Sequence, residues 1–435
     1  MSNTRQIAFE ALYKVGKTEA YSNITIDGYL SKTELDTRDK AFVSALFYGT
    51  IERKLTIDYQ LSLYLDKPLK KLRPEVLTIL ELGAYQILFM DKVPSSAAVN
   101  ESVRLAKKNG CAFAAGLVNA VLRKLDKNGI KLPQKEFFEE YLSIKYSCPT
   151  EYISVWLKEL GEEATVSLLE SSLGCPGVAV RVNTTKTSDD ELISLLSDEG
   201  VTAVPTQLEN ALILSLNSRD IEYLDTFRNG YFHVQDLSCQ ICAKALSVKE
   251  GDTVLDMCSA PGGKAFTVAE IMNDKGQVHC FDIYESRVKL ILDGARRLGL
   301  KSVSASVSDA SEYNADLGPA DAVLCDVPCS GLGIIGRKPE IKYKSLNSLE
   351  NLPVIQYNIL KNASRYVKKG GLLLYSTCTL LNRENADVCD KFLAENPEFT
   401  AINTLDDYKD RKYITLLPGK DGGDGFFIAT FKRNG

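Results

Sequence analysis

Hydrophobic positions in the first 130 residues recur at the spacing of amphipathic helices. Apolar side chains fall at i, i+3, i+4 and i+7, which places them on one face of a helix. Pro74 and Pro94 stand where such helices would begin, and Gly110 stands where one would end. The pattern predicts helices over residues 4–15, 38–65, 73–89, 95–109 and 113–125. It stops in the turn-rich stretch 127–135, so we expect an all-α bundle over residues 1–135.

A mixed segment follows, over residues 136–230. Helical spacing covers residues 151–160, 161–173 and 189–200, and apolar runs typical of strands cover residues 178–184 and 211–216. We therefore expect a small α+β, RRM-like linker domain.

From residue 231 onward, apolar runs of strand length alternate with helical stretches. The predicted strands lie at 252–258, 276–283, 302–308, 321–327, 371–377 and 426–433. Strands separated by helices indicate a mostly parallel, doubly wound sheet, so residues 231–435 are predicted to form an α/β domain. In such a fold the ligands bind at the carboxyl ends of the strands, and the chemistry should gather there.

Composition is that of a globular chain. Its 435 residues are 45% hydrophobic, which is enough to bury the cores of two or three domains. There is no apolar run of about 18 residues to span a bilayer and no apolar stretch of a secretory signal, so we expect a cytoplasmic protein. The 11 cysteines lack the dense spacing of a secreted scaffold, and we expect free thiols.

Charge is distributed unevenly along the chain. The net charge is −5, yet residues 1–130 carry 19 Lys and Arg against 14 Asp and Glu. A basic module attached to an acidic body can bind a phosphate backbone, although a margin of this size is also that of a solvated surface.

The first candidate site is "VLDMCSAPGGKAFTVAE". An apolar strand ends at Asp256, a turn with Gly262 and Gly263 follows, and a helix begins near Lys264. Small residues let the backbone approach a ligand, and the N–H groups of a helix start suit polar or anionic groups. Asp282 ends the next strand about 20 residues on, the spacing at which a carboxylate reaches ribose hydroxyls. The motifs for dinucleotides and nucleoside triphosphates are absent, so the pattern favours S-adenosylmethionine.

The second candidate site combines a carboxylate with two thiols. Asp326 and Cys329 follow one predicted strand, and Cys378 follows another, so both thiols can face one crevice. Cytosine carbon 5 is too weak a nucleophile to attack a sulfonium methyl group unless a thiolate first adds to carbon 6. Cys378 would be this nucleophile, Asp326 would assist at ring nitrogen 3, and Cys329 would remove the carbon-5 proton before release.

Several motifs resemble those of one family. "DMCSAPGGKA", "DVPCSGLG" and "YSTCTL" are similar to the signature motifs of the Nol/Nop/Sun RNA cytosine-C5 methyltransferases. "LFYGTIERK", "LELGAYQI" and "FAAGLVNAVLRKL" resemble the NusB-type RNA-binding module of its bacterial Sun/RsmB branch, which "VQDLSCQICA" also matches. The resemblance covers nearly the whole chain. The sequence departs from the family pattern at Gly336, which precedes Arg337 where the family usually has a second basic residue. This change would affect contact with the RNA backbone.

The resemblance implies a fold, an activity and site residues. The fold would be a Rossmann-like class I methyltransferase domain preceded by the NusB-like bundle and the small domain. The enzyme would be a monomer without metal or membrane partners. It would methylate a cytidine of 16S rRNA in free or partly assembled small subunits, with Cys378 as nucleophile and Cys329 as release base. The residues implied to line the S-adenosylmethionine site are Cys258, Ser259, Ala260, Pro261, Gly262, Gly263, Lys264, Asp282, Asp309 and Asp326.

Other interpretations stay open at this point. The residues do not separate ribosomal from transfer RNA, so one alternative is a cytosine-C5 methyltransferase of tRNA, and another is an RNA-binding factor with weak catalysis. The acceptor motif expected of a nitrogen methyltransferase is absent.

Five further residues are assigned structural roles. Cys239 and Cys242 form a single C-x-x-C in a helical stretch of a chain with two histidines, so we expect helix packing and no zinc site. His233 is expected to be an ordinary residue near a strand, Arg287 to lie on a solvated helix face, and Trp156 to fill a core.

Overall fold

The structure is a computed structural model that describes residues 4–18, 22–174, 177–216 and 220–435. The chain divides into two compact units. Unit 1 contains Met1–Lys158, Ser172–Gly174 and Lys338–Lys344, and unit 2 contains Glu159–Ser171, Cys175–Arg337 and Ser345–Gly435. Each unit is described by itself below.

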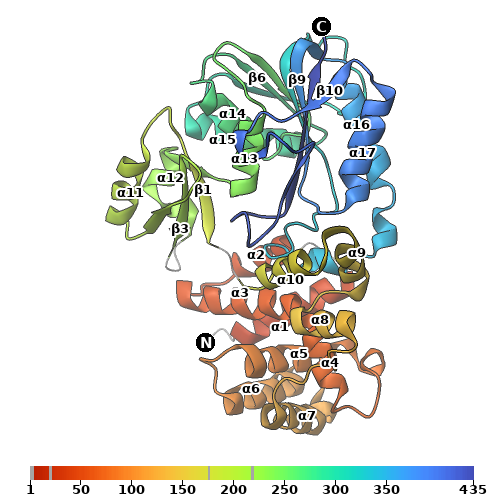
Figure 1. Ribbon diagram of the computed structural model, residues 1–435. Coiled ribbons are helices and arrows are strands. Elements are labelled where there is room, and N and C mark those ends of the chain that lie inside the picture. The colour runs from red at the N-terminus through yellow and green to blue at the C-terminus, as the bar shows by residue number, and fades with distance from the viewer. Residues whose placement is uncertain (1–3, 19–21, 175–176, 217–219) are drawn as a thin grey trace. The chain divides into compact units, whose positions relative to one another are not determined.

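Unit 1 is built from helices, as the hydrophobic spacing predicted (Figure 1). They are α1 (Thr4–Thr18), α2 (Ser22–Leu30), α3 (Thr37–Glu52), α4 (Lys54–Ser62), α5 (Pro74–Phe89), α6 (Ser95–Lys108), α7 (Ala115–Asn128), α8 (Phe138–Tyr146) and most of α9 (Thr150–Leu160). Pro74 begins α5 and Pro94 precedes α6, where proline costs no helical hydrogen bond. The stretch 38–65 forms two helices, because the backbone leaves the helical conformation at Arg53. Within the described ranges, no helix is both long and apolar enough to cross a membrane.

Unit 2 contains a four-stranded antiparallel sheet with the order β2-β3-β1-β4. Its strands are β1 (Val178–Val182), β2 (Thr202–Pro205), β3 (Ala211–Ser215) and β4 (Phe232–Val234). The helices in this part of the chain are α10 (Glu162–Ser171), α11 (Asp189–Asp198) and α12 (Asp225–Arg228). β4 pairs with β1 although it follows residue 230, so the small sheet draws a strand from the stretch that the sequence assigned to the last domain. With three residues, β4 is too short for its hydrophobic pattern to show this.

Unit 2 also contains a larger sheet, with the order β10-β12-β9-β8-β5-β6-β7 and β11 paired to β12. Its strands are β5 (Thr253–Asp256), β6 (Gln277–Asp282), β7 (Val303–Val307), β8 (Ala320–Asp326), β9 (Val367–Thr377), β10 (Phe399–Ile402), β11 (Ile414–Leu416) and β12 (Phe426–Arg433). The strands from β9 to β7 are parallel, whereas β12 is antiparallel to β9.

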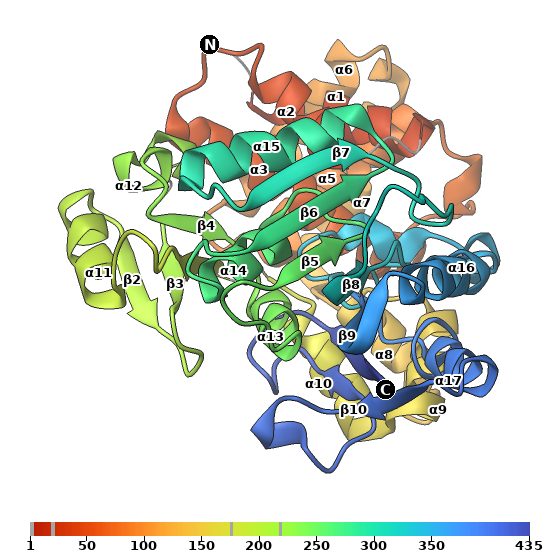
Figure 2. The same ribbon diagram turned by 90° about the horizontal axis from the view of Figure 1, so that it is seen from above.

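Helices cover both faces of this larger sheet (Figures 1 and 2). One face carries α13 (Leu237–Ala245), α14 (Gly263–Ile271) and α15 (Glu285–Leu298), and the other carries α16 (Leu352–Ser364) and α17 (Ala386–Glu395). A separate hydrophobic core fills each interface. The predicted doubly wound, Rossmann-like fold is thereby confirmed.

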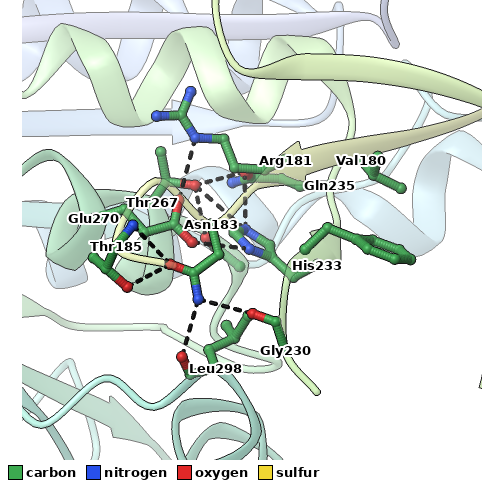
Figure 3. Close-up of polar contacts among 12 residues, drawn as sticks. Val180, Arg181, Asn183, Thr185, Gly230, His233, Gln235, Thr267, Glu270 and Leu298 are labelled. Carbon is green, nitrogen blue, oxygen red and sulfur yellow. Dashed lines mark hydrogen bonds and ion pairs between the residues drawn. The ribbon is translucent and has the colours of Figure 1, made fainter. Parts of the chain in front are cut away.

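A buried polar network joins the small sheet to α14 (Figure 3). Arg181 of β1 and His233 of β4 both contact the carboxylate of Glu270 in α14, at 3.2 and 3.4 Å. Thr267, one turn earlier in the helix, donates a hydrogen bond of 2.6 Å to Gln235. Because these groups are buried and paired with one another, they fix the helix that follows the glycine turn relative to the small sheet.

Candidate active site

The carboxyl ends of four parallel strands meet at one edge of the larger sheet. β5, β6 and β8 end in Asp256, Asp282 and Asp326, and β9 ends one residue before Cys378. β5 pairs with β6 and β8, and β8 pairs with β9, so the four ends are neighbours. Ligands of doubly wound sheets bind at this edge, which makes it the candidate active site.

The glycine turn between β5 and α14 requires glycine at one position. Gly262 has φ of +106°, and a Cβ there would lie 2.4 Å from the ring of Phe266. The turn thus leads directly into α14 at Gly263, and the first N–H groups of a helix lack intrahelical acceptors. A polar or anionic ligand group can bind there.

Two polar side chains close to the turn are buried and form no hydrogen bond of full geometry among the described residues. They are Asp256, through both carboxylate oxygens, and Ser259, through its hydroxyl. Burial raises the pKa of Asp256 to about 7, although the Ser259 hydroxyl and the Cys258 N–H lie near enough to Asp256 to oppose this effect. Buried polar atoms are normally hydrogen-bonded, so this pair fits a site whose polar ligand completes it.

Asp282 lies across the same edge and is bridged to the glycine turn. Its side chain is buried, accepts a hydrogen bond from the Tyr284 N–H, and lies 3.2 Å from the Arg287 guanidinium. Arg287 also donates to the Ala260 carbonyl at 3.1 Å. Arg287 is exposed on its helix, as expected, and in addition its guanidinium contacts Asp282 and the glycine turn, which the sequence did not indicate. The pattern of one helix could not show that the partners of Arg287 lie at the end of β6 and in the glycine turn.

The remaining residues of the implied cofactor site differ from one another in burial and in location. Cys258 is half-buried, and burial raises the pKa of its thiol well above the ordinary value. Pro261 is exposed in the turn. Asp309 lies in the loop after β7, where it accepts hydrogen bonds from the backbone N–H and the hydroxyl of Ser311.

The two candidate thiols lie in direct contact. The register of β8 and β9 places Asp326 opposite Ser376, so the residues just beyond these strand ends come together. The Cys329 and Cys378 sulfur atoms are 3.1 Å apart, and the Gly333 N–H donates to the Cys378 carbonyl at 2.9 Å. The cysteines within the described ranges are all free thiols, as their spacing predicted.

The surroundings of Cys378 keep its thiol protonated in the free protein. The hydrogen bond with Cys329, burial and the nearby Asp326 carboxylate raise the pKa of Cys378 well above its ordinary value, and the nearby Lys264 ammonium opposes them. Since only the thiolate is a nucleophile, Cys378 needs a proton acceptor when it reacts.

The side chain of Lys264 extends from the glycine turn toward the thiols. Its ammonium donates to the Asp326 carboxylate at 2.7 Å and contacts the Cys239 sulfur at 3.5 Å. The other Asp326 oxygen accepts from the Ser376 hydroxyl at 2.8 Å. Burial opposes the charge on Lys264, but the Asp326 carboxylate raises the lysine pKa well above its ordinary value. The site thus holds a partly buried ion pair beside the thiols.

Two contacts near the site, made by Cys239 and by Arg337, were not predicted from the sequence. Cys242 is buried in the core, as expected, but Cys239 faces the Lys264 ammonium and does more than pack a helix. Arg337 forms ion pairs with Asp236 and Asp424 at 2.9 and 2.8 Å. The charge of Arg337 is thus paired within the protein. The sequence around Arg337 does not indicate this pairing, because both partners are distant in the chain.

Comparisons with known proteins match this architecture. A family model described as "16S rRNA methyltransferase RsmB/F" matches residues 243–432. A NusB family model matches residues 2–127, and a ferredoxin-like domain model for RsmF/B-like methyltransferases matches residues 148–220. The fold and the sheet-edge site define a Rossmann-like methyltransferase preceded by NusB-like and ferredoxin-like domains.

Individual relatives narrow this class. A Bacillus subtilis protein named "Probable ribosomal RNA small subunit methyltransferase B" is 35% identical, over 100% of this chain and 99% of its own. The Pseudomonas putida "Ribosomal RNA small subunit methyltransferase B" is 30% identical over 98% of each chain. The solved structure of PH0851 has a TM-score of 0.83 at 25% identity, covering 100% and 99% of the two chains. This chain belongs to the RsmB/F family of 16S rRNA methyltransferases.

Membership establishes an rRNA methyltransferase that uses a cofactor of the S-adenosylmethionine type. The solved structure of NSun6 from Pyrococcus horikoshii, titled as containing SFG, has a TM-score of 0.59 at 22% identity, covering 66% of this chain and 98% of its own. That similarity shows the fold alone.

Proposed function

We propose that this enzyme methylates carbon 5 of a specific cytidine in 16S rRNA, through a covalent bond between Cys378 and carbon 6. The observation that carries the proposal is the 3.1 Å separation of the Cys329 and Cys378 sulfur atoms at the sheet edge. Methylation of nitrogen or oxygen needs positioning and proton removal, and has no use for two adjacent thiols. Methylation of an unreactive ring carbon needs a nucleophile before transfer and a base after it.

The cofactor site is proposed to comprise the glycine turn and Asp282. The Asp282 carboxylate would accept hydrogen bonds from ribose hydroxyls, and the first N–H groups of α14 would bind the carboxylate of the methionine part. The polar atoms of Asp256 and Ser259 would supply further contacts. S-adenosylmethionine, when bound there, supplies a methyl group on a positively charged sulfur.

Cys378 begins the proposed reaction. Its thiol loses a proton, and the thiolate forms a bond to carbon 6 of the cytosine. The electron pair of the carbon 5–carbon 6 double bond moves to carbon 5, which bonds to the methyl carbon as the sulfonium carbon–sulfur bond breaks.

The Lys264–Asp326 pair accepts and donates the protons that move during the addition step. It takes up the proton of Cys378 and supplies one to ring nitrogen 3, so the charge of the pair is unchanged. Positioning at 2.7 Å from Lys264 and 2.8 Å from Ser376 holds the Asp326 carboxylate in one orientation for this exchange. Protonated nitrogen 3 makes carbon 6 more electrophilic.

Cys329 acts after methyl transfer. Its thiol first gives up its proton to solvent, and the thiolate then removes the carbon-5 proton. The carbon–hydrogen electron pair restores the ring double bond as the bond from carbon 6 to Cys378 breaks, and the electron pair of that bond leaves on the Cys378 sulfur. The proton on nitrogen 3 returns through the Lys264–Asp326 pair to the Cys378 thiolate, which restores the thiol. The two thiols therefore have opposite places in the reaction.

The test compares Cys378→Ala with Cys329→Ala on 16S rRNA that lacks the modification, using labelled methyl transfer and denaturing gels. Cys378→Ala should abolish methylation, by several orders of magnitude, and leave no covalent RNA. Cys329→Ala should still attack and methylate, but its RNA should stay attached and migrate slowly. Cys389→Ala, which removes a buried thiol in α17, is the matched control and should behave as wild type.

Two outcomes would contradict the proposal. An adduct trapped by Cys378→Ala and not by Cys329→Ala would reverse the two roles. Full activity in both variants would exclude the covalent mechanism. Bisulfite sequencing of RNA from a deletion strain separates the substrates, because the proposal requires a lost methylcytidine in 16S rRNA and none in tRNA.

A further inference from the structure

Cys329 lies between two peptide groups that are each held by a side chain. The Pro328 carbonyl accepts a hydrogen bond from the Gln356 amide at 3.0 Å. The Ser330 N–H donates to the Glu384 carboxylate at 2.9 Å. Peptide groups are planar, so the soft backbone angles of a residue lie between its two flanking peptide groups. Holding both groups therefore fixes the backbone of Cys329 and the direction in which its side chain leaves the chain.

The two side chains that hold these peptide groups also bind each other. Gln356 lies in α16, Glu384 ends the 3-10 helix η6 (Asn382–Glu384), and both are fully buried. The Gln356 amide donates at 2.9 Å to the same Glu384 oxygen that accepts from Ser330. Since both partners of the Gln356 side chain are acceptors, its amide nitrogen must face them. We call Gln356 and Glu384 the clamp, and both lie in unit 2 with Cys329.

The clamp also reaches the loop that carries Cys378. Glu384 lies six residues after Cys378, and the Ser330 hydroxyl donates at 2.7 Å to Thr379, the next residue after that thiol. The backbone of Cys378 has further supports, because β9 before it is paired on both sides and its carbonyl accepts from the Gly333 N–H at 2.9 Å. Loss of the clamp should therefore displace Cys329 more than Cys378.

Stability alone does not account for the clamp. The second oxygen of Glu384 and the oxygen of Gln356 are buried and form no hydrogen bond within the part of the chain that the structure describes. A buried carboxylate is costly when its oxygens are not all hydrogen-bonded. What the clamp provides is a fixed conformation of one backbone segment, and that segment carries the Cys329 thiol.

We infer that Gln356 and Glu384 are positioning residues for Cys329, because they hold its sulfur beside that of Cys378, where the carbon-5 proton is removed. A base must lie within hydrogen-bond reach of the proton that it removes, so a displaced thiol slows release. The inference rests on the proposed function, since it concerns the step after methyl transfer.

The experiment uses the full chain in single-turnover reactions on 16S rRNA that lacks the modification, quenched in denaturant at a series of times. Gln356→Met removes both amide hydrogen bonds, and Glu384→Met removes the acceptor of the Ser330 N–H. The covalent RNA adduct should form near the wild-type rate in both variants. It should decay about tenfold more slowly, as expected when hydrogen bonds that position a reacting group are lost.

Two control variants separate positioning from folding. Glu384→Gln keeps an oxygen that can accept both hydrogen bonds, so its adduct should decay at the wild-type rate. Asn183→Leu removes a buried amide that donates to the Gly230 and Leu298 carbonyls, both at 2.9 Å, and joins the end of β1 to the end of α15 (Figure 3). This variant should lower the urea unfolding midpoint and leave adduct decay unchanged.

Wild-type decay in both Gln356→Met and Glu384→Met would overturn the inference while the proposed function stands. Equally slow decay in Glu384→Gln or Asn183→Leu would also overturn it, because the effect would then not depend on the clamp. Wild-type decay in Cys329→Ala would instead overturn the proposed role of Cys329, and the inference with it. If Glu384→Met fails to fold, Gln356→Met decides the matter, because methionine is close to glutamine in size and shape.

Discussion

Replacing Lys342 with methionine should stabilise unit 1 at neutral pH and remove part of its pH dependence. Burial lowers the pKa of Lys342 from 10.5 to about 8. At 1.36 kcal/mol for each pH unit, the buried ammonium costs unit 1 about 3 kcal/mol at pH 7. Methionine removes this cost but also the donor to the Glu52 carbonyl, which is worth about 1 kcal/mol. The variant should therefore be about 2 kcal/mol more stable at pH 7.

The sign of the pH dependence follows from the two protonation states. Between about pH 8 and pH 10.5 the native lysine is neutral while the unfolded lysine keeps its proton, so the contribution of Lys342 to stability rises with pH. Methionine has no such contribution. The advantage of the variant should shrink through this window and reverse near pH 10, where only the lost hydrogen bond remains.

The single tryptophan of the chain gives the assay. Trp156 is fully buried and stacks on Tyr152 in unit 1, so its fluorescence in urea reports the unfolding of that unit. The free energy of unfolding is compared between wild type and Lys342→Met from pH 7 to pH 10. Lys108→Met, at an exposed position in α6, is the control and should show no pH-dependent difference. A difference between Lys342→Met and wild type that stays constant with pH would refute the reasoning.

Three further predictions concern the site and the RNA. Asp282→Ala should weaken S-adenosylmethionine binding about 10- to 100-fold in calorimetry, because a ribose diol loses a charged acceptor; equal affinity would reject that assignment. The hydrogen bond with Cys329 and burial raise the pKa of Cys378, so its alkylation by iodoacetamide should still accelerate above pH 9, and a plateau near pH 8 would contradict this. The double change Lys107→Glu, Lys108→Glu in α6 should weaken RNA binding and reduce its salt slope by about 2 through lost counterion release, whereas an unchanged slope would reject an RNA contact there.

The hydrophobic pattern determined the fold class because burial of one face is a local requirement. A helix must bury one stripe of side chains, and a strand must bury one or both faces. The spacing of hydrophobic residues along the sequence therefore indicates which kind of element forms. Most helices of unit 1 and six strands of the larger sheet were predicted on this basis, whereas α2, α8, β10 and β11 were not. The domain boundaries at residues 135 and 230 stay predictions.

The identities of the chief site residues were also present in the sequence. Residues such as Asp282 and Cys378 follow apolar strands, and the ends of parallel strands share one edge. A glycine turn like that at Gly262 is visible because a positive φ excludes other residues. Their catalytic and binding roles stay predictions until the variants are measured.

Only the tertiary structure decided which side chains meet across long distances in the chain. Lys264 stands in the cofactor turn by sequence, yet its ammonium reaches Asp326, 62 residues later. Arg287 bridges the end of β6 and the glycine turn, and Lys342 caps a helix 290 residues earlier in the chain. A local pattern records whether a residue is buried, but its partner is set by how separate elements pack, and packing brings together groups with no fixed sequence spacing.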